Sequence, residues 1–427
     1  MKATFTAVCV LAVGISLWGR PAVSAPADPE WGGPVLTDSE AVEDAMAASD
    51  EVARLDSRVA ARQKKVDRAP FNLRNPELRV QDISTEYANP LANHQFQIGL
   101  RFRLPEYGEV NELVATARLE YWDAKVDAFV YRNDLATNVR LAWLDVVFGG
   151  LLSDLASRRV TLAERQLRVI GRLIELGQVP FVRKVKAQTA LLRARRDAAE
   201  ARSALDAARG RLGTLTGSAG PVDATGYSTP QGNPDYQTLL LMAQKHRPEF
   251  EFEQQRLDLA RTERRADELK MIPNFSFVEA AYHYESLGND WGELSFGIEL
   301  PLFNWIRGKP LEINDGGGRE TRSFAGTEEV SADIGEEYYR FSAARGAWLA
   351  LTDEADRAGE DIRLLVEQAR GQSVPEDDVL ELEMAALDLE EMRLEAERDY
   401  AVGFFRLCGA VGVDDCGILL QGGAVAP

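Results

Sequence analysis

The sequence predicts a mainly α-helical chain with a small β component, formed by a tandem repeat of one helix–strand–strand–helix–helix unit. Three observations predict this fold class. Landmarks of the first half recur in the second half at a nearly constant spacing. Long segments carry apolar residues at every seventh position, and short segments in each half alternate apolar and polar residues.

The composition is that of a folded protein, with 45% hydrophobic and 27% charged residues in a chain of 427. The formal net charge is −19. An acidic balance of this size argues against a nucleic-acid partner, because no basic excess exists to displace counterions from phosphates.

The first element, residues 1–27, is typical of a secretory signal peptide. Lys2 precedes an apolar stretch from Ala7 to Trp18, and small residues follow, with cleavage after Ala25 or Ala27. Removal of this segment takes away two basic residues and changes the net charge from −19 to −21. No later apolar run approaches the roughly 18–20 residues of a membrane-spanning helix. The sequence therefore predicts an exported protein that does not cross a membrane as helices.

The duplication divides the rest of the chain into a first repeat at 28–227 and a second repeat at 228–427, which opens with a linker at 228–236. The matching landmarks, all offset by 194 to 197 residues, are Met46 and Met242, Pro76 and Pro273, Pro105 and Pro301, Gly177 and Gly371, and the segments 211–217 and 406–412. Each repeat is predicted to contain a helix, two strands and two long helices. The strands fall at about 77–104 and about 274–300, and a short tail ends the chain.

The long helices carry a heptad pattern that predicts a left-handed coiled coil. Apolar residues recur by seven at Leu155, Leu162, Val169 and Leu176, and again at Leu380, Leu387, Leu394 and Ala401. Between them, an alanine-rich stripe runs through Ala187, Ala190, Ala194, Ala198, Ala201, Leu205, Ala208 and Leu212. Taken alone, the helices also fit one seam of a soluble bundle.

The second strand of each repeat alternates strictly over about ten residues, the length and pattern of a membrane β-strand. The residues predicted to face lipid are Phe96, Ile98, Leu100 and Phe102, with Leu294, Phe296, Ile298 and Leu300 in the second repeat. A soluble sheet with one wet face remains the other interpretation. Four strands cannot close a barrel, so strands placed in a membrane must be pooled by several chains.

The preceding strands alternate less cleanly. Each changes faces once, near Gln81–Asp82 and near Phe277–Val278, which predicts a β-bulge in both. Aromatic residues gather near the hairpin ends, where they form either an interfacial girdle or local packing; they are Tyr87, Tyr282, Tyr284 and Trp291.

The segments RLIELGQVP, RPEFEFEQQRLDLARTERRADELKMIPNF and LSFGIELPLFN resemble the TolC-like outer-membrane efflux proteins over nearly the whole mature chain. Within that family, NPEL and PLFN are most similar to the heavy-metal cation efflux branch. The resemblance implies a homotrimer in which each chain gives four strands to a shared twelve-stranded outer-membrane β-barrel. The helices then form a long coiled-coil α-barrel in the periplasm.

The resemblance further implies a passive channel that meets a periplasmic adaptor and an inner-membrane pump at the helical hairpin turns. The turn residues for adaptor contact are Gly177, Val179, Pro180, Gly371, Val374 and Pro375. Opposite charges flank the turns at Arg183, Lys186, Glu376, Asp377 and Asp378. They are either solvated loop ends or a gate in which the acidic and basic tips pair.

The chain departs from the family pattern in three places. Glycines at 314–318 stand where a continuous helix is expected, and Gly149–Gly150 interrupts the long helix of the first repeat. Arg183 and Lys184 stand where the family commonly has Asp-Val, which the second tip keeps as Asp378 and Val379.

No catalytic, cofactor or metal pattern is present, so the protein is predicted not to be an enzyme. His94, His246 and His283 are scattered, and a surface or helix-face position is the preferred interpretation for each. Cys408 and Cys416 could pair in an oxidising compartment, and the paired and free states stay equally open. The alternative function is a soluble periplasmic coiled-coil adaptor. Drugs, metal cations and secreted proteins all remain candidate substrates.

Overall fold

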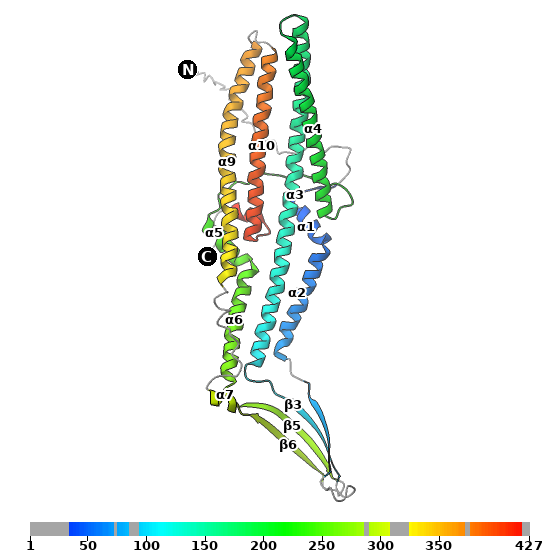
Figure 1. The fold of residues 1–427 in the computed structure, drawn as a ribbon, viewed down its shortest axis with the longest axis vertical. Helices are drawn as coiled ribbons and strands as arrows, with labels where there is room; N and C mark the ends of the chain where they lie inside the picture. Colours follow the sequence, from blue (N-terminus) through cyan, green and yellow to red (C-terminus); the bar gives the residue numbers. More distant parts are fainter. Residues whose placement is uncertain are drawn as a thin grey trace, which may run out of the picture. The chain divides into compact units, whose positions relative to one another are not determined.

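A computed structural model describes residues 34–71, 75–84, 94–285, 290–307, 324–371 and 376–420. The signal segment, the glycine-rich 314–318, Tyr87, Val374 and Pro375 lie outside the described residues. The fold is mainly helical with one four-stranded sheet, so the predicted fold class is confirmed (Figure 1).

Nearly the same order of elements occurs twice along the chain, with the short helix α7 as an addition in the second run. The first run comprises α1 (Asp38–Ala48), α2 (Asp50–Arg68), β2 (Glu77–Ser84), β3 (His94–Arg103), α3 (Glu109–Glu175) and α4 (Phe181–Leu215). The second comprises α5 (Tyr236–His246), α6 (Pro248–Leu269), β5 (Asn274–Glu285), β6 (Trp291–Glu299), α7 (Leu302–Arg307), α9 (Phe324–Gly371) and α10 (Glu376–Val411). Short segments complete the list: β1 (Val35–Leu36), β4 (Asp223–Ala224) and the 3-10 helices Ala69–Phe71 and Cys416–Leu420.

The chain forms two compact units, and each unit draws on both halves of the sequence. Within the described residues, the first unit draws on 34–48, 138–231 and 342–405, and the second on 49–137, 232–341 and 406–420. Corresponding pieces of the two repeats therefore pack together within a unit.

The first unit is built from the ends of the long helices. Leu380, Leu387, Leu394 and Ala401 are all buried, which confirms the heptad of the second repeat. In the first repeat Leu155 and Val169 are buried, but Leu176 is exposed because it lies at the turn where the seam ends.

The alanine-rich stripe differs from the prediction at one position. Ala190 is exposed, and the adjacent Leu191 packs with Ala163 and Ala194 instead. Gly149–Gly150 does not interrupt α3, which is helical throughout its 67 residues. A Cβ added at Gly149 would lie 3.4 Å from the Leu205 side chain, so this glycine packs against α4.

The turn between α3 and α4 ends the helix by a Schellman motif. Gly177 has φ +71°, a conformation that side chains with a Cβ rarely adopt. The Gln178 amide donates to the Leu173 carbonyl at 2.8 Å and the Gly177 amide donates to the Ile174 carbonyl at 2.9 Å. These bonds satisfy carbonyls that the last helical turn leaves free, which explains the short Gly-Gln break.

The second unit holds the sheet, α2, α5, α6 and a disulfide. Arg58 pairs with Asp127 at 2.8 Å and Lys65 with Glu120 at 2.7 Å, so α2 is joined to the first half of α3. Cys408 and Cys416 are bonded to each other, which decides between the two states that the sequence left open.

By length and composition, α3 is the one helix among the described residues that could cross a membrane. It contains an 18-residue stretch that is apolar enough to do so, although the sequence predicted no such stretch. Half of that stretch is buried inside the protein, as in the core helix of a soluble domain.

Candidate functional site

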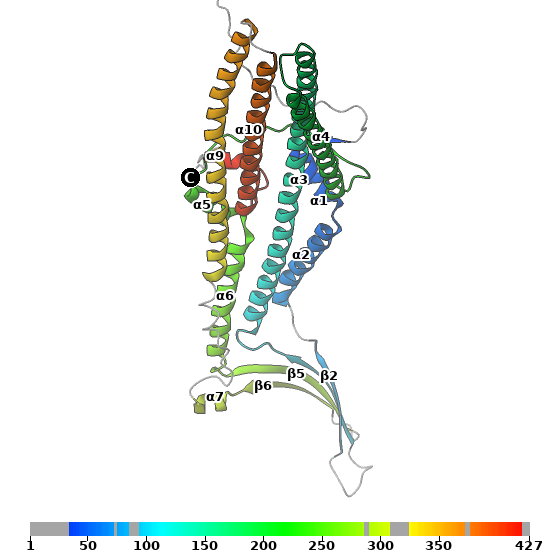
Figure 2. The same ribbon diagram turned by 45° about the horizontal axis from the view of Figure 1, so that its top comes forward.

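The four strands form one antiparallel sheet in the order β2-β3-β5-β6, and the β3–β5 pairing joins the two repeats (Figure 2). The β3–β5 register pairs Phe96 with Tyr284 and Leu100 with Ala280. Directly paired residues of antiparallel strands lie on the same face. The register therefore assigns every strand residue to one of two faces.

One face carries mostly apolar side chains, and its large apolar residues are exposed; we call it the apolar sheet face. It contains all eight residues predicted to face lipid, with exposures from 37% at Phe96 to 62% at Leu294. The register adds five more exposed residues to these eight: Leu78, Val80, Phe275, Tyr282 and Tyr284. Of these five, the sequence singled out Tyr282 and Tyr284, as aromatic residues near the hairpin ends. Leu78, Val80 and Phe275 were missed because β2 and β5 alternate less regularly. A row of large exposed apolar side chains over four strands is unusual for a surface in water.

The opposite face is polar and internally paired; we call it the polar sheet face. Glu279 is 4% exposed and accepts a hydrogen bond from Arg101 Nε at 2.7 Å, while the Arg101 guanidinium also lies 3.9 Å from the centre of the Phe277 ring. Arg103 pairs with Glu77 at 2.8 Å. The two faces of one sheet therefore suit two different environments.

His283 also belongs to the polar sheet face, so a surface or helix-face position was the wrong interpretation for it. It is buried on β5, stacks on Trp291 with ring centres 4.8 Å apart, and lies 2.7 Å from Glu293 Oε2. Trp291 faces this histidine, away from the apolar sheet face. His246, by contrast, is exposed at the end of α5, as expected.

The bulge predictions had different outcomes. The register of β5 with β6 shifts between Phe275 and Phe277, close to the predicted bulge near Phe277–Val278. The register of β2 with β3 is continuous from Glu77 to Ser84, so the bulge predicted near Gln81–Asp82 is wrong. The strand instead places Asp82 opposite Phe96, which retains every ladder hydrogen bond at the cost of one acidic residue in the apolar row.

β2 and β6 are edge strands. Within the described residues, each pairs with one neighbour, β2 with β3 and β6 with β5. Their outer sides therefore present backbone groups that are available for pairing with another chain.

The second candidate site lies where α10 begins, in the first unit; we call it the tip cluster. Arg183 Nη1 on α4 donates to Asp377 Oδ2 at 2.6 Å, and Asp377 is only 2% exposed. Gln166 Nε2 on α3 donates to Asp377 at 3.4 Å, and Arg165 pairs with Glu376 at 2.9 Å. The tip cluster thus joins the hairpin of the first repeat to the start of α10.

The structure brings together three of the five charged residues named at the tips. Arg183, Glu376 and Asp377 are paired, whereas Lys186 and Asp378 are exposed and form no ion pair with any described residue. Sequence reasoning missed Arg165 and Gln166, which precede the turn by about three helical turns. The sequence feature that could have identified them is their position on the polar side of the heptad pattern of α3. Gly177, Val179 and Pro180 form the described turn, and Gly371 ends α9.

The described residues contain no group of three or more His, Cys, Asp or Glu side chains arranged to hold a metal ion. The features that distinguish this molecule are surfaces: an apolar sheet face, two open strand edges and a charged helical tip.

No protein-family model and no curated protein matches this chain. Solved structures do match. The outer membrane protein VceC of Vibrio cholerae matches with a TM-score of 0.65 and 15% identity over 88% of this chain and 96% of VceC. The outer membrane channel MtrE of Neisseria gonorrhoeae, in its open state, matches with a TM-score of 0.63 and 18% identity over 88% of both chains. The outer membrane channel CmeC of Campylobacter jejuni matches with a TM-score of 0.62 and 13% identity over 90% of this chain and 88% of CmeC. The chain therefore has the fold of outer-membrane channels.

Proposed function

We propose that this protein is the outer-membrane channel of a tripartite efflux or export system, a passive conduit from the periplasm to the exterior. The observation that carries the proposal is the sheet. One face carries exposed apolar side chains on all four strands, and the other carries charged, paired side chains. Lipid on one side and an aqueous lumen on the other satisfy both faces.

The open edges of the sheet support assembly from several copies. A strand edge cannot remain unpaired in hydrocarbon, because each bare backbone group there costs several kcal/mol. Pairing β2 of one copy with β6 of the next removes both edges in a closed ring. The solved outer-membrane channels share this fold, and with three copies the ring has twelve strands, as the family resemblance implies.

The long helices supply the part of the channel outside the membrane. A helix of 67 residues is about 100 Å long at 1.5 Å per residue. In this proposal the helical hairpins extend into the periplasm, and the turn at Gly177 and its counterpart after Gly371 meet a periplasmic adaptor and an inner-membrane pump. The tip cluster acts as the gate, with the Arg183–Asp377 pair holding the closed state.

The alternative, a soluble periplasmic adaptor, is less well supported. It requires the apolar sheet face to lie in water or against a protein partner over four strands. Transfer of that face into lipid removes the apolar area from water at about 25 cal/mol per Å².

Membrane fractionation of cells that express the full chain tests the proposal. We expect the protein in the outer-membrane fraction, extractable only with detergent, and migrating as a trimer in unheated gel electrophoresis. Heating should convert it to the monomer. Recovery of a soluble periplasmic monomer would contradict the proposal.

A further inference from the structure

Large exposed apolar side chains lie at the four junctions between the helices and the sheet. Phe71 follows α2, Tyr107 lies between β3 and α3, and Ile272 lies between α6 and β5. The fourth junction, after β6, carries the short helix α7. All of these positions belong to the second unit, so exposed apolar groups mark one end of its sheet.

The short helix α7 carries several of these exposed apolar side chains. Leu302, Phe303 and Ile306 recur at helical spacings of three and four and so share one face. Phe303 is 72% exposed and Ile306 is 80% exposed. A helix of six residues is too short to persist in water through its own hydrogen bonds. Its position must therefore be stabilised from outside.

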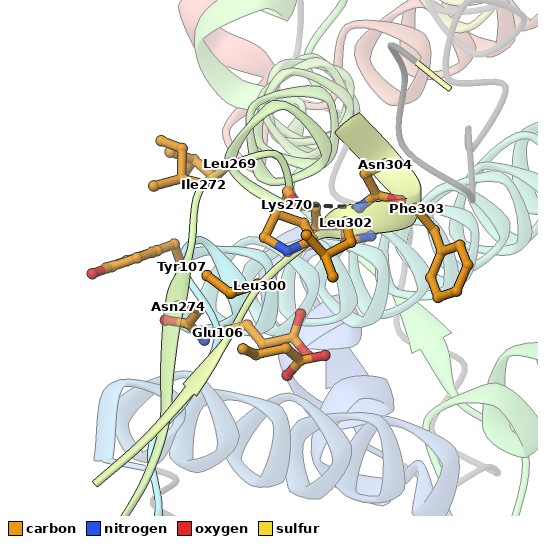
Figure 3. A pocket seen from close by; sticks show the side chains of 12 residues that line it. Glu106, Tyr107, Leu269, Lys270, Ile272, Asn274, Leu300, Leu302, Phe303 and Asn304 are labelled. Atoms are coloured by element: carbon orange, nitrogen blue, oxygen red, sulfur yellow. Dashed lines mark hydrogen bonds between the residues drawn. The ribbon is translucent and has the colours of Figure 1, made fainter. Parts of the chain in front are cut away.

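One side of α7 is fixed to the end of α6. Asn304 Nδ2 donates to the Lys270 carbonyl at 3.2 Å, as Figure 3 shows, and Trp305 Nε1 donates to the Met271 carbonyl at 2.7 Å. These carbonyls follow the last turn of α6, where the helix leaves acceptors unpaired. The two bonds orient α7, and its apolar face remains uncovered by the described residues.

A cavity of about 270 Å³ lies beside α7 (Figure 3). Tyr107, Leu300 and Phe303 give it apolar walls, and Lys270 and Asn274 are among its polar lining residues. The amide nitrogen of Asn274 is buried without a hydrogen-bond partner, so it is a donor without an acceptor. A mixture of apolar wall and polar groups matches the boundary between the headgroup and the acyl chains of a phospholipid.

The apolar face of α7 continues the apolar sheet face along the chain. Phe275 pairs with Ile298 at the end of the β5–β6 ladder, and Leu300 continues the alternation immediately before α7. Leu300 and Leu302 are both exposed, at 52%. The apolar environment that covers the apolar sheet face can therefore also cover α7, because no described polar residue interrupts the apolar surface between them.

We propose that α7 is an in-plane membrane anchor, whose Leu302, Phe303 and Ile306 side chains insert among the phospholipids of the periplasmic leaflet. This inference rests on the proposed function, because it takes the sheet to cross the outer membrane. The polar bonds on the opposite side of α7 stop it at the depth of the headgroups, the position of amphipathic helices that lie in the interface.

Site-specific fluorescence quenching tests this anchor. The two mature cysteines are bonded to each other, so an introduced cysteine is the only free thiol for an environment-sensitive dye. The labelled variants are Phe303→Cys on α7, Leu294→Cys at the middle of the apolar sheet face, and Arg54→Cys on exposed α2. Each is reconstituted into phosphatidylethanolamine–phosphatidylglycerol vesicles that carry a nitroxide either at the headgroup or deep in the acyl chain. Unheated gel electrophoresis confirms assembly, and Ile306→Cys replaces Phe303→Cys if the latter does not assemble.

The label at Phe303 should be quenched about twofold or more better by the headgroup nitroxide than by the deep one. The label at Leu294 should show the reverse order, and the label at Arg54 should respond to neither. A Phe303 label that behaves like the one at Arg54, or like the one at Leu294, overturns the anchor while quenching at Leu294 supports the channel. Absence of quenching at Leu294 contradicts the channel and the anchor together.

Discussion

The ion pair between Arg183 and Asp377 gives the sharpest test of the gate. Asp377 is 2% exposed and Arg183 is 48% exposed, with 2.6 Å between Nη1 and Oδ2. Arg183→Ala would leave a buried carboxylate with the Gln166 amide, at 3.4 Å, as its remaining side-chain partner. Removal of one partner from a fully buried pair costs roughly 3–5 kcal/mol, and from an exposed pair at most about 1 kcal/mol.

The half-exposed arginine places this pair between those limits. Water screens one partner, so we expect a loss of about 1–2 kcal/mol per protomer, because the start of α10 still stabilises the carboxylate through the helix dipole. That loss corresponds to about a 5- to 30-fold change in the ratio of closed to open states. Three copies acting on one mouth would multiply the effect.

Conductance of the reconstituted channel in planar bilayers measures this change. We expect Arg183→Ala to raise the open probability at low salt, and Arg183→Glu to raise it further by repelling Asp377. High salt should reduce the difference, because it screens the pair in the parent protein. Adding Asp377→Arg to Arg183→Glu should restore closure, whereas adding Asp378→Lys should not, because Arg183 contacts Asp377 rather than Asp378.

Lys186→Ala is the matched control, since Lys186 is exposed on the same helix and forms no ion pair with a described residue. Its conductance should equal that of the parent. If Arg183→Ala conducts like Lys186→Ala at low salt, and the charge swap has no effect, the tip cluster only joins two helices and the gate is elsewhere.

Three further predictions follow from the sheet, the disulfide and α6. Leu100→Arg, at mid-strand on the apolar sheet face, should cost roughly 2–4 kcal/mol of barrel stability, whereas Gln97→Arg on the polar sheet face should be mild; equal trimer yields in unheated gels would place neither face in lipid. Reduction of the Cys408–Cys416 bond, which closes a separation of 8 residues, should lower unfolding stability by about 2–3 kcal/mol, and urea melts with and without reductant would show it. Burial raises the pKa of Glu253, against the opposing effect of Arg256. The folded protein therefore loses stability as pH rises above the ordinary glutamate pKa, because the buried carboxyl must then ionise. Glu253→Gln should therefore raise the melting temperature at pH 7 and lose that advantage below about pH 4. If the difference in melting temperature between the variant and the parent is the same at both pH values, the raised pKa of Glu253 is wrong.

The fold was predictable wherever the sequence records a period. Strict alternation placed Phe96 and Leu294 on one exposed face, and the heptad at Leu380 and Leu394 correctly identified a buried seam. The duplication predicted the repeated order of elements, because most landmarks mark a strand end, a turn or a helix end that both repeats need, while Met46 and Met242 lie within α1 and α5. Gly177 predicted the first hairpin turn for the same reason: a left-handed backbone conformation favours glycine.

Patterns failed where one residue admits two local solutions. The sequence around Asp82 fits two structures: a strand that switches faces, and a regular strand with one polar residue in the apolar row. The continuous pairing with β3 shows that the second is correct. Gly149 reads as a helix break, but the approach of Leu205 makes it a packing position instead. His283 is isolated along the chain, and only pairing with β6 brings Trp291 and Glu293 to it.

By itself, the sequence determined the periodic features, since hydrophobic spacing and turn residues act over a few neighbouring positions. The tertiary structure decided which distant residues meet. It paired Arg183 with Asp377 and left Asp378 in solvent, joined the two repeats through β3 and β5, and fixed α7 to the end of α6 with its apolar face uncovered. These contacts depend on the register and rotation of elements separated by up to about two hundred residues. Local sequence cannot encode them, because the free energy of each contact exists only after the elements have packed.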